Sequence, residues 1–193
     1  MKIIFRKISK YNYHSKDKKS DFEYVSSVLN QTINPHSEKA ESVITPESQI
    51  VYVSSLNRAR ECIKTRKGQK IITSKVLNEI PFELKSFVNE KSYLKYGSIS
   101  VRKAFIKAFL DDDLLITREQ LFKQIESLLK KIERSKHSIV SVISHSFRLK
   151  LIQAYISTNG KIITNPKLIR KFVKPNERTF NFEEEFEVNI QYK

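Results

Sequence analysis

The sequence is poor in the residues that form covalent cross-links and tight phosphate loops. Its 193 residues include one cysteine, three glycines, one methionine and no tryptophan. The single cysteine, Cys62, excludes an intrachain disulfide and a metal site built from cysteines, and we interpret it as a small buried hydrophobe. Phosphate loops commonly depend on glycine, which makes up ~7% of an average protein. The scarcity of glycine here weighs against such a loop.

Long apolar runs are also missing. No stretch approaches the ~20 apolar residues that a membrane helix needs, and the sequence becomes charged at Arg6 before a signal-peptide core could form. We therefore expect a cytoplasmic protein that makes no membrane contact. With 39% hydrophobic residues in a chain of this length, we expect one domain over residues 1–193.

Positive charge is in large excess, with a formal net charge of +15. Such a charge attracts anionic metabolites and polyanions, although a solvated lysine-rich surface explains it equally well. The basic runs are spread over residues 16–19, 58–75 and 167–174. The sequence contains no helix-turn-helix spacing, zinc finger or RNA-recognition aromatic motif, so nucleic acid remains a possible partner through the basic surface alone.

Three short apolar runs each end in residues suited to holding a phosphate. They cover residues 3–5, 50–53 and 139–143, and they are followed by Arg6 and Lys7, by the segment 54–60, and by Ser144 and His145. In open α/β sheets, ligands bind beyond the carboxyl ends of the strands. We therefore expect the three ends to meet in one cationic pocket.

Predicted strands and helices alternate along most of the chain. Helices are expected from Asn34-Pro35 to about residue 45, over 57–67 before Gly68, after Thr117, and over 147–157. Thr117 and Gln120 match a capping box. A further strand is expected over 70–74. This alternation predicts an α/β fold with a mostly parallel central sheet and helices on both faces.

Two regions depart from the alternation. Residues 83–115 are expected to form a helical insertion or cap. The alternating apolar residues from Phe180 to Ile190 indicate edge strands or a hairpin. The aspartates at 111–113 point in different directions on a helix end, so we predict no metal site there, and we expect no cofactor.

The order of these motifs resembles the histidine phosphatase superfamily, also called phosphoglycerate mutase-like. The resemblance rests on strand-Arg-Lys near the start, Ser-Ser-Leu-x-Arg-Ala-Arg at 54–60, Leu-Asn-Glu-Ile at 77–80 and strand-Ser-His at 144–145. It covers about residues 1–156. That family opens its site with Arg-His-Gly, continues with a Ser-x-x-x-Arg-Ala segment and an acid, and ends it with a second histidine. The resemblance implies a phosphoglycerate mutase-like fold.

The resemblance also implies roles for individual residues. Arg6 and Arg58 match the phosphate-clamping arginines, His145 matches the second phosphate-contacting histidine, and Glu79 matches the proton donor. Asn12 matches more loosely an asparagine that often follows the opening motif. Arg58 and Arg60 lie two apart on a helix and cannot face the same pocket, and the resemblance selects Arg58.

Lys7 departs from the family pattern, because it stands where the family has its nucleophilic histidine. A neutral imidazole can attack phosphorus at neutral pH. A lysine amine with its ordinary pKa near ~10.4 is under ~1% neutral at pH 7. A protonated Lys7 fits better as a point-charge clamp on phosphate. We therefore expect the pocket to bind anions but to have lost the covalent step, in which the nucleophile attacks phosphorus.

Three functions remain open at this point. The first is a divergent histidine-phosphatase-like protein that binds a phosphorylated small molecule or phosphoprotein, with activity weak or lost. The second is an active phosphomonoester hydrolase with a non-standard route, using His145 as nucleophile or Glu79 to activate water. The third is a basic nucleic-acid-binding or scaffold module. The sequence leaves open the ligand, any remaining catalysis and the oligomeric state.

Overall fold

The computed structural model describes residues 1–8, 22–36, 43–44, 48–173 and 185–189. Its centre is a five-stranded sheet with strand order β5-β3-β6-β1-β7. The strands are β1 (Lys2–Lys7), β3 (Ile50–Ser54), β5 (Lys70–Ser74), β6 (Ile139–Ser144) and β7 (Phe186–Asn189). Neighbouring pairs among the first four are parallel, and β7 runs antiparallel to β1. The prediction of an α/β fold with a mostly parallel sheet is confirmed.

The central strands are buried along nearly their whole length. All five residues of β3 and five of the six in β6 are buried, as expected for parallel strands that are covered on both faces. Strand β5 forms one edge of the sheet and is more exposed. Strand β7 forms the other edge, where Phe186 stacks on Phe5 with ring centroids 4.6 Å apart.

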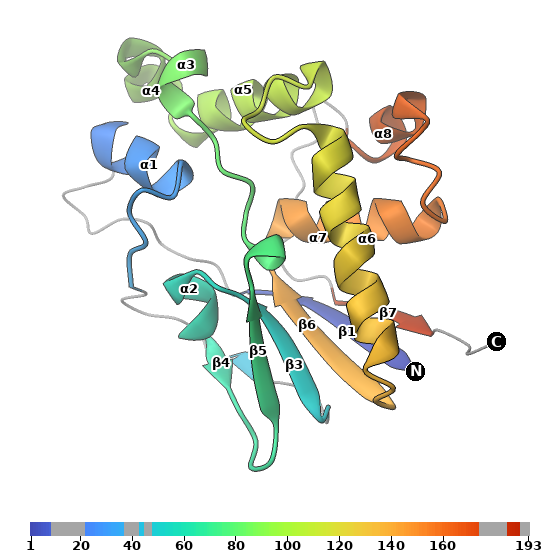
Figure 1. The fold of residues 1–193 in the computed structure, drawn as a ribbon. Coiled ribbons are helices and arrows are strands. Elements are labelled where there is room, and N and C mark those ends of the chain that lie inside the picture. The colour runs from blue at the N-terminus through green and yellow to red at the C-terminus, as the bar shows by residue number, and fades with distance from the viewer. Residues whose placement is uncertain (9–21, 37–42, 45–47, 174–184, 190–193) are drawn as a thin grey trace.

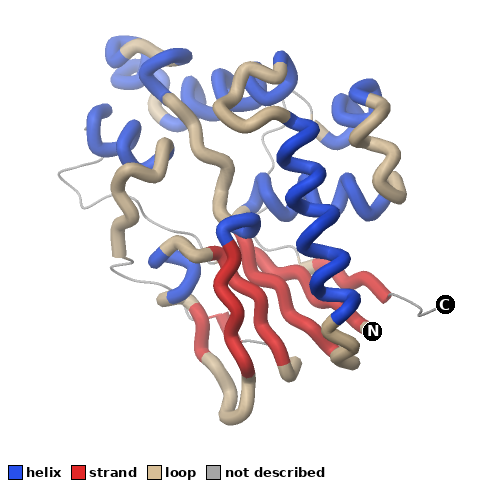
Figure 2. The backbone as a smooth tube through the Cα atoms, in the orientation of Figure 1, coloured by secondary structure: helices blue, strands red, loops and turns tan. Residues whose placement is uncertain are grey.

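Helices cover both faces of the sheet (Figures 1 and 2). On one face lie α6 (Arg118–Arg134), α7 (Ser146–Ser157) and α8 (Pro166–Phe172). The predicted capping box at Thr117 is confirmed: the Thr117 side chain accepts a hydrogen bond from the Gln120 backbone N–H, and the Gln120 side chain accepts one from the Thr117 backbone N–H. Leu121, Ile125 and Ile132 of α6 are fully buried in the main core.

The other face carries the short helix α2 (Asn57–Arg60) and a small parallel sheet of β2 (Val43–Ile44) and β4 (Ile63–Lys64). Ala59 and Cys62 pack against Val51, Val53 and Ile143 in a second core cluster. Cys62 is buried, as predicted. On this face, α2 packs against the sheet just beyond the carboxyl end of β3.

Four helices gather beyond the carboxyl ends of the parallel strands (Figure 1). They are α1 (Phe22–Leu29), α3 (Leu84–Phe87), α4 (Glu90–Tyr96) and α5 (Ser98–Asp111). Phe22, Phe82 and Tyr93 belong to their shared core. The region 83–115 is therefore largely helical, and it lies on the side of the sheet where the predicted site would be.

The predicted helix over 57–67 is wrong beyond Arg60. The segment turns at residues 61–62, and Ile63 and Lys64 pair with β2. Burial of Cys62 against the sheet and strand pairing of β-branched Ile63 outweigh the helical pattern. Gly68, with φ of +87°, serves the turn before β5 and not a helix end.

The predicted helix start at Asn34-Pro35 is also wrong in the described residues, since 33–36 are not helical. Asn34 instead bonds to the first residue of α2: its Oδ1 accepts from the backbone N–H of Asn57 at 3.0 Å, and its carbonyl accepts from Asn57 Nδ2. An asparagine that caps another helix is not available to begin its own.

Residues 190 and 174–184 of the expected C-terminal strands lie outside the described part of the chain, and Phe186–Asn189 forms the one strand seen in that segment. None of the described helices has the length and apolar character needed to span a membrane.

Candidate functional site

Five polar side chains meet at the carboxyl edge of the sheet. Lys7 ends β1, Arg58 lies on α2, Glu79 follows the 3-10 helix η2 (Lys75–Leu77), His145 follows β6, and Arg148 lies in the first turn of α7. Lys7, Arg58, His145 and Arg148 are at most 9% exposed, and Glu79 is half-buried. We call these five residues the cationic cluster.

Strand register explains why residues so far apart in sequence come together. Lys7 pairs with Ser144 in the parallel ladder between β1 and β6, so the ends of these strands lie side by side. Ser144 Oγ donates to the Leu77 carbonyl at 2.6 Å, which fixes η2 and the following segment against β6. Charged and polar residues converge because four parallel strands end at one edge.

A hydrogen-bond chain orients the imidazole of His145. Nε2 of His145 lies 2.9 Å from Ser54 Oγ, and the Ser54 hydroxyl donates to Asn78 Oδ1 at 2.9 Å. The backbone N–H of Ser55 also donates to this Asn78 oxygen, which identifies it as an acceptor. The single hydroxyl proton of Ser54 is therefore directed to Asn78, so the proton between Ser54 and His145 belongs to Nε2. In the neutral ring, Nδ1 then carries the lone pair.

His145 is neutral at pH 7. Burial is the main cause that holds its pKa well below the usual 6.5, and the charges of Arg58, Arg148 and Lys7 lower the pKa further. These three cations therefore act directly on the imidazole. Its helix α7 begins at the next residue, and the His145 side chain makes no capping bond to that helix.

Arg148 is a buried cation with an unfilled bonding direction. Its Nε donates to the Asn78 carbonyl at 3.0 Å, whereas its Nη1 is buried and has no hydrogen-bond partner among the described residues. Burial lowers the pKa of Arg148 to about 10, partly offset by the Glu79 carboxylate. The guanidinium is therefore still charged at neutral pH.

Arg58 is a second buried arginine, on α2. Its side chain is 2% exposed. Arg60, two residues later, is exposed. The prediction that only one of the two arginines can face inward is confirmed, and Arg58 is that one.

Glu79 is the counter-charge to the two arginines. Burial raises the pKa of its carboxyl group, against the lowering effects of Arg148, the Ile80 N–H, Arg58 and the Phe147 N–H. Phe147 is the second residue of α7, so the carboxylate accepts from the N-terminal turn of that helix, where negative charge is favourable. Glu79 thus has a structural role that the sequence did not indicate.

Arg6, the other predicted phosphate-binding arginine, forms an ion pair with Glu185. Its Nε donates to a carboxylate oxygen of Glu185 at 2.7 Å, next to the start of β7. Successive residues of a strand point to opposite faces, and Lys7 is the neighbour whose charge acts on His145. Asn12 lies outside the described residues. The structure therefore brings together Lys7, Arg58, Glu79 and His145, and it pairs Arg6 with Glu185.

Sequence reasoning missed Arg148, Ser54 and Asn78. Arg148 could have been found from its position. It lies three residues after His145, so it shares a face of the helix start with His145, and its neighbours Phe147 and Leu149 are apolar. Asn78 is polar within an apolar stretch, but its bonds to Ser54 and Ser55 depend on tertiary packing.

No family model and no curated protein matches this chain in sequence. The resemblance to histidine phosphatases therefore stays a prediction, and the cationic cluster has to be interpreted from its own geometry.

Proposed function

We propose that this protein binds a phosphorylated small molecule, or another anionic ligand such as a phosphorylated protein side chain, at the cationic cluster. The observation that carries the proposal is the excess of buried positive charge. Lys7, Arg58 and Arg148 act on a neutral His145, and Glu79 is the carboxylate of the described residues that acts on both arginines. Among the described residues, the cluster thus brings together three cations and one carboxylate.

The energetics favour an anion at this position. A buried ion keeps an effective desolvation penalty of several kcal/mol unless an opposite charge and hydrogen bonds offset it. The described residues of the cluster include one such carboxylate, and the buried Nη1 of Arg148 has an unused donor. A bound oxyanion supplies both missing features, namely negative charge and acceptor oxygens.

The donor chemistry suits phosphate in particular. Guanidinium groups present parallel N–H donors that match the oxygens of phosphate, and lysine adds a compact point charge. The neutral His145 has its Nε2 proton directed to Ser54, so it offers the ligand a lone pair at Nδ1 in its present form. A nearby dianion favours protonation of that nitrogen, which turns it into a further donor.

We further propose that the chain is a divergent histidine-phosphatase-like protein whose phosphatase activity is weak or lost. In support, the motif order is matched by a mostly parallel sheet, and four of the residues that the resemblance selects lie in one cluster. Lys7 occupies the nucleophile position of that resemblance, and a protonated amine cannot attack phosphorus. The pairing of Arg6 with Glu185 departs from the family pattern.

One observation favours the alternative of an active phosphomonoester hydrolase. His145 is neutral, and an imidazole with a free lone pair is competent for nucleophilic attack. If His145 is the nucleophile, turnover should pass through an acid-labile phosphohistidine on this residue.

Thermal unfolding in sulfate tests the binding proposal, because sulfate keeps its charge across neutral pH. At matched ionic strength, sulfate should raise the melting temperature more than chloride does, since a ligand of the folded state stabilises it. Arg58→Leu should abolish this difference, whereas Arg60→Leu, on the same helix but exposed, should keep it. Equal sulfate effects in both variants would overturn the proposal.

Assays with p-nitrophenyl phosphate and a panel of phosphomonoesters separate binding from catalysis. We expect turnover near the background rate. Robust turnover that is lost in His145→Ala would contradict the binding-only function and support the hydrolase.

A further inference from the structure

A second group of cations, distinct from the cationic cluster, lies along α6 and edge strand β5. Helix α6 carries Lys131 and Arg134, and the turn after it carries Lys136. Lys70 begins β5, and Lys75 begins η2, which contacts α6. All five side chains are exposed. We call these residues the basic rim.

Backbone contacts hold the two sides of the rim next to each other. Lys70 pairs with Ile50, and Ile50 pairs with Val140 of the strand that follows α6. The backbone N–H of Lys70 donates to the Gln49 carbonyl, and the side chain of Gln49 lies 2.9 Å from Nδ1 of His137. The start of β5 and the turn after α6 are therefore joined through one residue.

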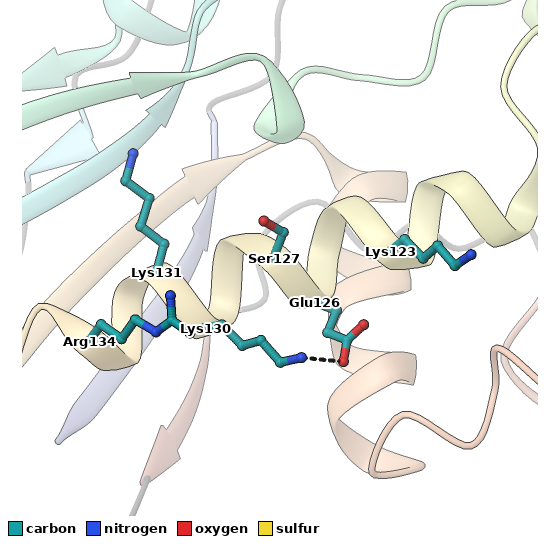
Figure 3. Close-up of a pocket in the computed structure, with 6 residues that line it drawn as sticks. All are labelled: Lys123, Glu126, Ser127, Lys130, Lys131 and Arg134. Atoms are coloured by element: carbon teal, nitrogen blue, oxygen red, sulfur yellow. Dashed lines mark hydrogen bonds and ion pairs between the residues drawn. The ribbon is translucent and has the colours of Figure 1, made fainter.

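Lys70 lies on the same face of the sheet as α6. Ile50 and Tyr52 pack in the same core as the buried side of α6, and a residue paired in register points to the same face. Lys70 therefore lies on the face that α6 covers. Figure 3 shows Lys131 and Ser127 on the side of α6 toward η2 and the strands, and Lys130 and Glu126 on the opposite side.

Carboxylates neutralise the neighbouring lysines but not the rim. Lys123 pairs with Glu119 at 2.6 Å, and Lys130 pairs with Glu126 at 2.8 Å. None of the five rim residues forms an ion pair with a carboxylate of the described residues. A hollow of about 470 Å³ adjoins the rim, lined by Lys123, Glu126, Ser127, Lys130, Lys131 and Arg134.

The backbone of Lys136 gives independent support for a role of this charge. Lys136 has φ of +55°, the left-handed conformation that glycine or asparagine normally takes after a helix. A lysine held in that conformation costs about 1 kcal/mol or more relative to glycine. The strain is understandable if the charge at this position is needed.

We propose that the basic rim binds the phosphodiester backbone of nucleic acid, without sequence specificity. The rim follows β5 for about 17 Å from Lys70 to Lys75, which is long enough to contact several successive phosphates of one strand. An anionic membrane fits less well, because the exposed apolar residues Leu94, Tyr96 and Ile99 lie on α4 and α5, and exposed Ile71 of β5 points to the opposite face of the sheet from Lys70. This inference is independent of the function proposed for the cationic cluster.

Fluorescence anisotropy with labelled RNA and with duplex DNA, each about 20 nucleotides long, tests the proposal over roughly 50 to 200 mM salt. We expect the affinity to fall steeply with salt in both cases. The triple variant Lys131→Ala, Arg134→Ala, Lys136→Asn should bind about tenfold or more weakly, with a salt slope smaller by about 2 to 3 units. Asparagine is chosen because it tolerates the left-handed conformation.

The control is a second triple variant with the same loss of charge, Lys91→Ala, Lys103→Ala, Lys161→Ala. These lysines are exposed and lie outside the rim, so their removal should change the affinity by less than about threefold if location matters more than net charge. Equal weakening in both triple variants would overturn the proposal. Dissociation constants above about 100 µM at the lowest salt, or rim-dependent binding to anionic vesicles but not to nucleic acid, would also overturn it.

Discussion

His145 donates a hydrogen bond from Nε2 to the hydroxyl oxygen of Ser54, and the Ser54 hydroxyl donates a hydrogen bond to Asn78 Oδ1. This chain defines the tautomer of a buried imidazole whose other neighbours are cations. It also makes Ser54, which is fully buried, the residue that determines whether Nδ1 carries a lone pair or a proton.

Replacing Ser54 should therefore change the tautomer of His145. In Ser54→Ala, Nε2–H loses its acceptor, and a buried unsatisfied donor costs about 1 to 3 kcal/mol. We expect 15N shifts of His145 to move away from the Nε2–H pattern, and the free energy of unfolding to fall by that amount. Ser55→Ala, whose hydroxyl also donates to Asn78, should keep the tautomer. An unchanged spectrum in Ser54→Ala would contradict the assigned proton position.

His145 should make stability depend on pH in the mildly acidic range. Its pKa is depressed in the folded protein, so between that value and about 6.5 the unfolded chain binds a proton that the folded chain does not. The free energy of unfolding should therefore fall as the pH drops below about 6.5, by at most ~1.4 kcal/mol per pH unit.

Urea unfolding of the wild type and of His145→Gln from pH 5 to pH 8 isolates the contribution of His145. The contributions of the other titrating groups cancel when the free energies of unfolding of the two proteins are subtracted. The difference in stability should be constant above about pH 7 and should shrink as the pH falls below about 6.5. His137→Gln, at a partly exposed position, serves as the control. A difference that does not vary with pH would contradict the depressed pKa.

Removing the charge of Glu79 should destabilise the protein and strengthen anion binding. Glu79→Gln removes the carboxylate that opposes Arg148 and accepts from the first turn of α7. Loss of one partner of a buried pair costs about 3 to 5 kcal/mol, and we expect the lower part of that range because Glu79 is half-buried. Sulfate should then restore more stability in Glu79→Gln than in the wild type, measured by thermal unfolding. Glu83→Gln is the matched control.

Lys7→His tests whether the lysine silences a phosphatase site. If the resemblance is right, this substitution supplies the neutral imidazole that nucleophilic attack needs, and p-nitrophenyl phosphate turnover should appear. Lys7→Gln, which removes the charge but adds no nucleophile, should stay inactive. Folded Lys7→His protein that binds sulfate but shows no turnover would argue against the resemblance to histidine phosphatases.

The sequence predicted the parts of the fold that follow from periodicity. The strands at 50–54 and 70–74 and the capping box at Thr117 appear as expected, because apolar spacing and cap chemistry are local. The helix over 57–67 failed because Cys62 and Ile63 form tertiary contacts that local propensity does not contain.

The residues of the candidate site also fall into two groups, those that the sequence predicted and those that depend on tertiary packing. Strand ends indicated Lys7 and His145, since parallel strands meet at one edge. The role of Arg148 and the helix-capping role of Glu79 depend on how α7 packs against residues 78–79. The pairing of Arg6 with Glu185 depends on β7, whose position beside β1 no local pattern specifies.

The pairing of β1 with β6 has a consequence for folding. Lys7 ends β1, and His145 follows β6, more than a hundred residues later in the sequence. The two side chains meet only after β1 has paired with β6. Such distant contacts form slowly, because loop closure must precede them. We therefore expect the cationic cluster to assemble late, so that anion binding reports on the completion of folding and not on its early stages.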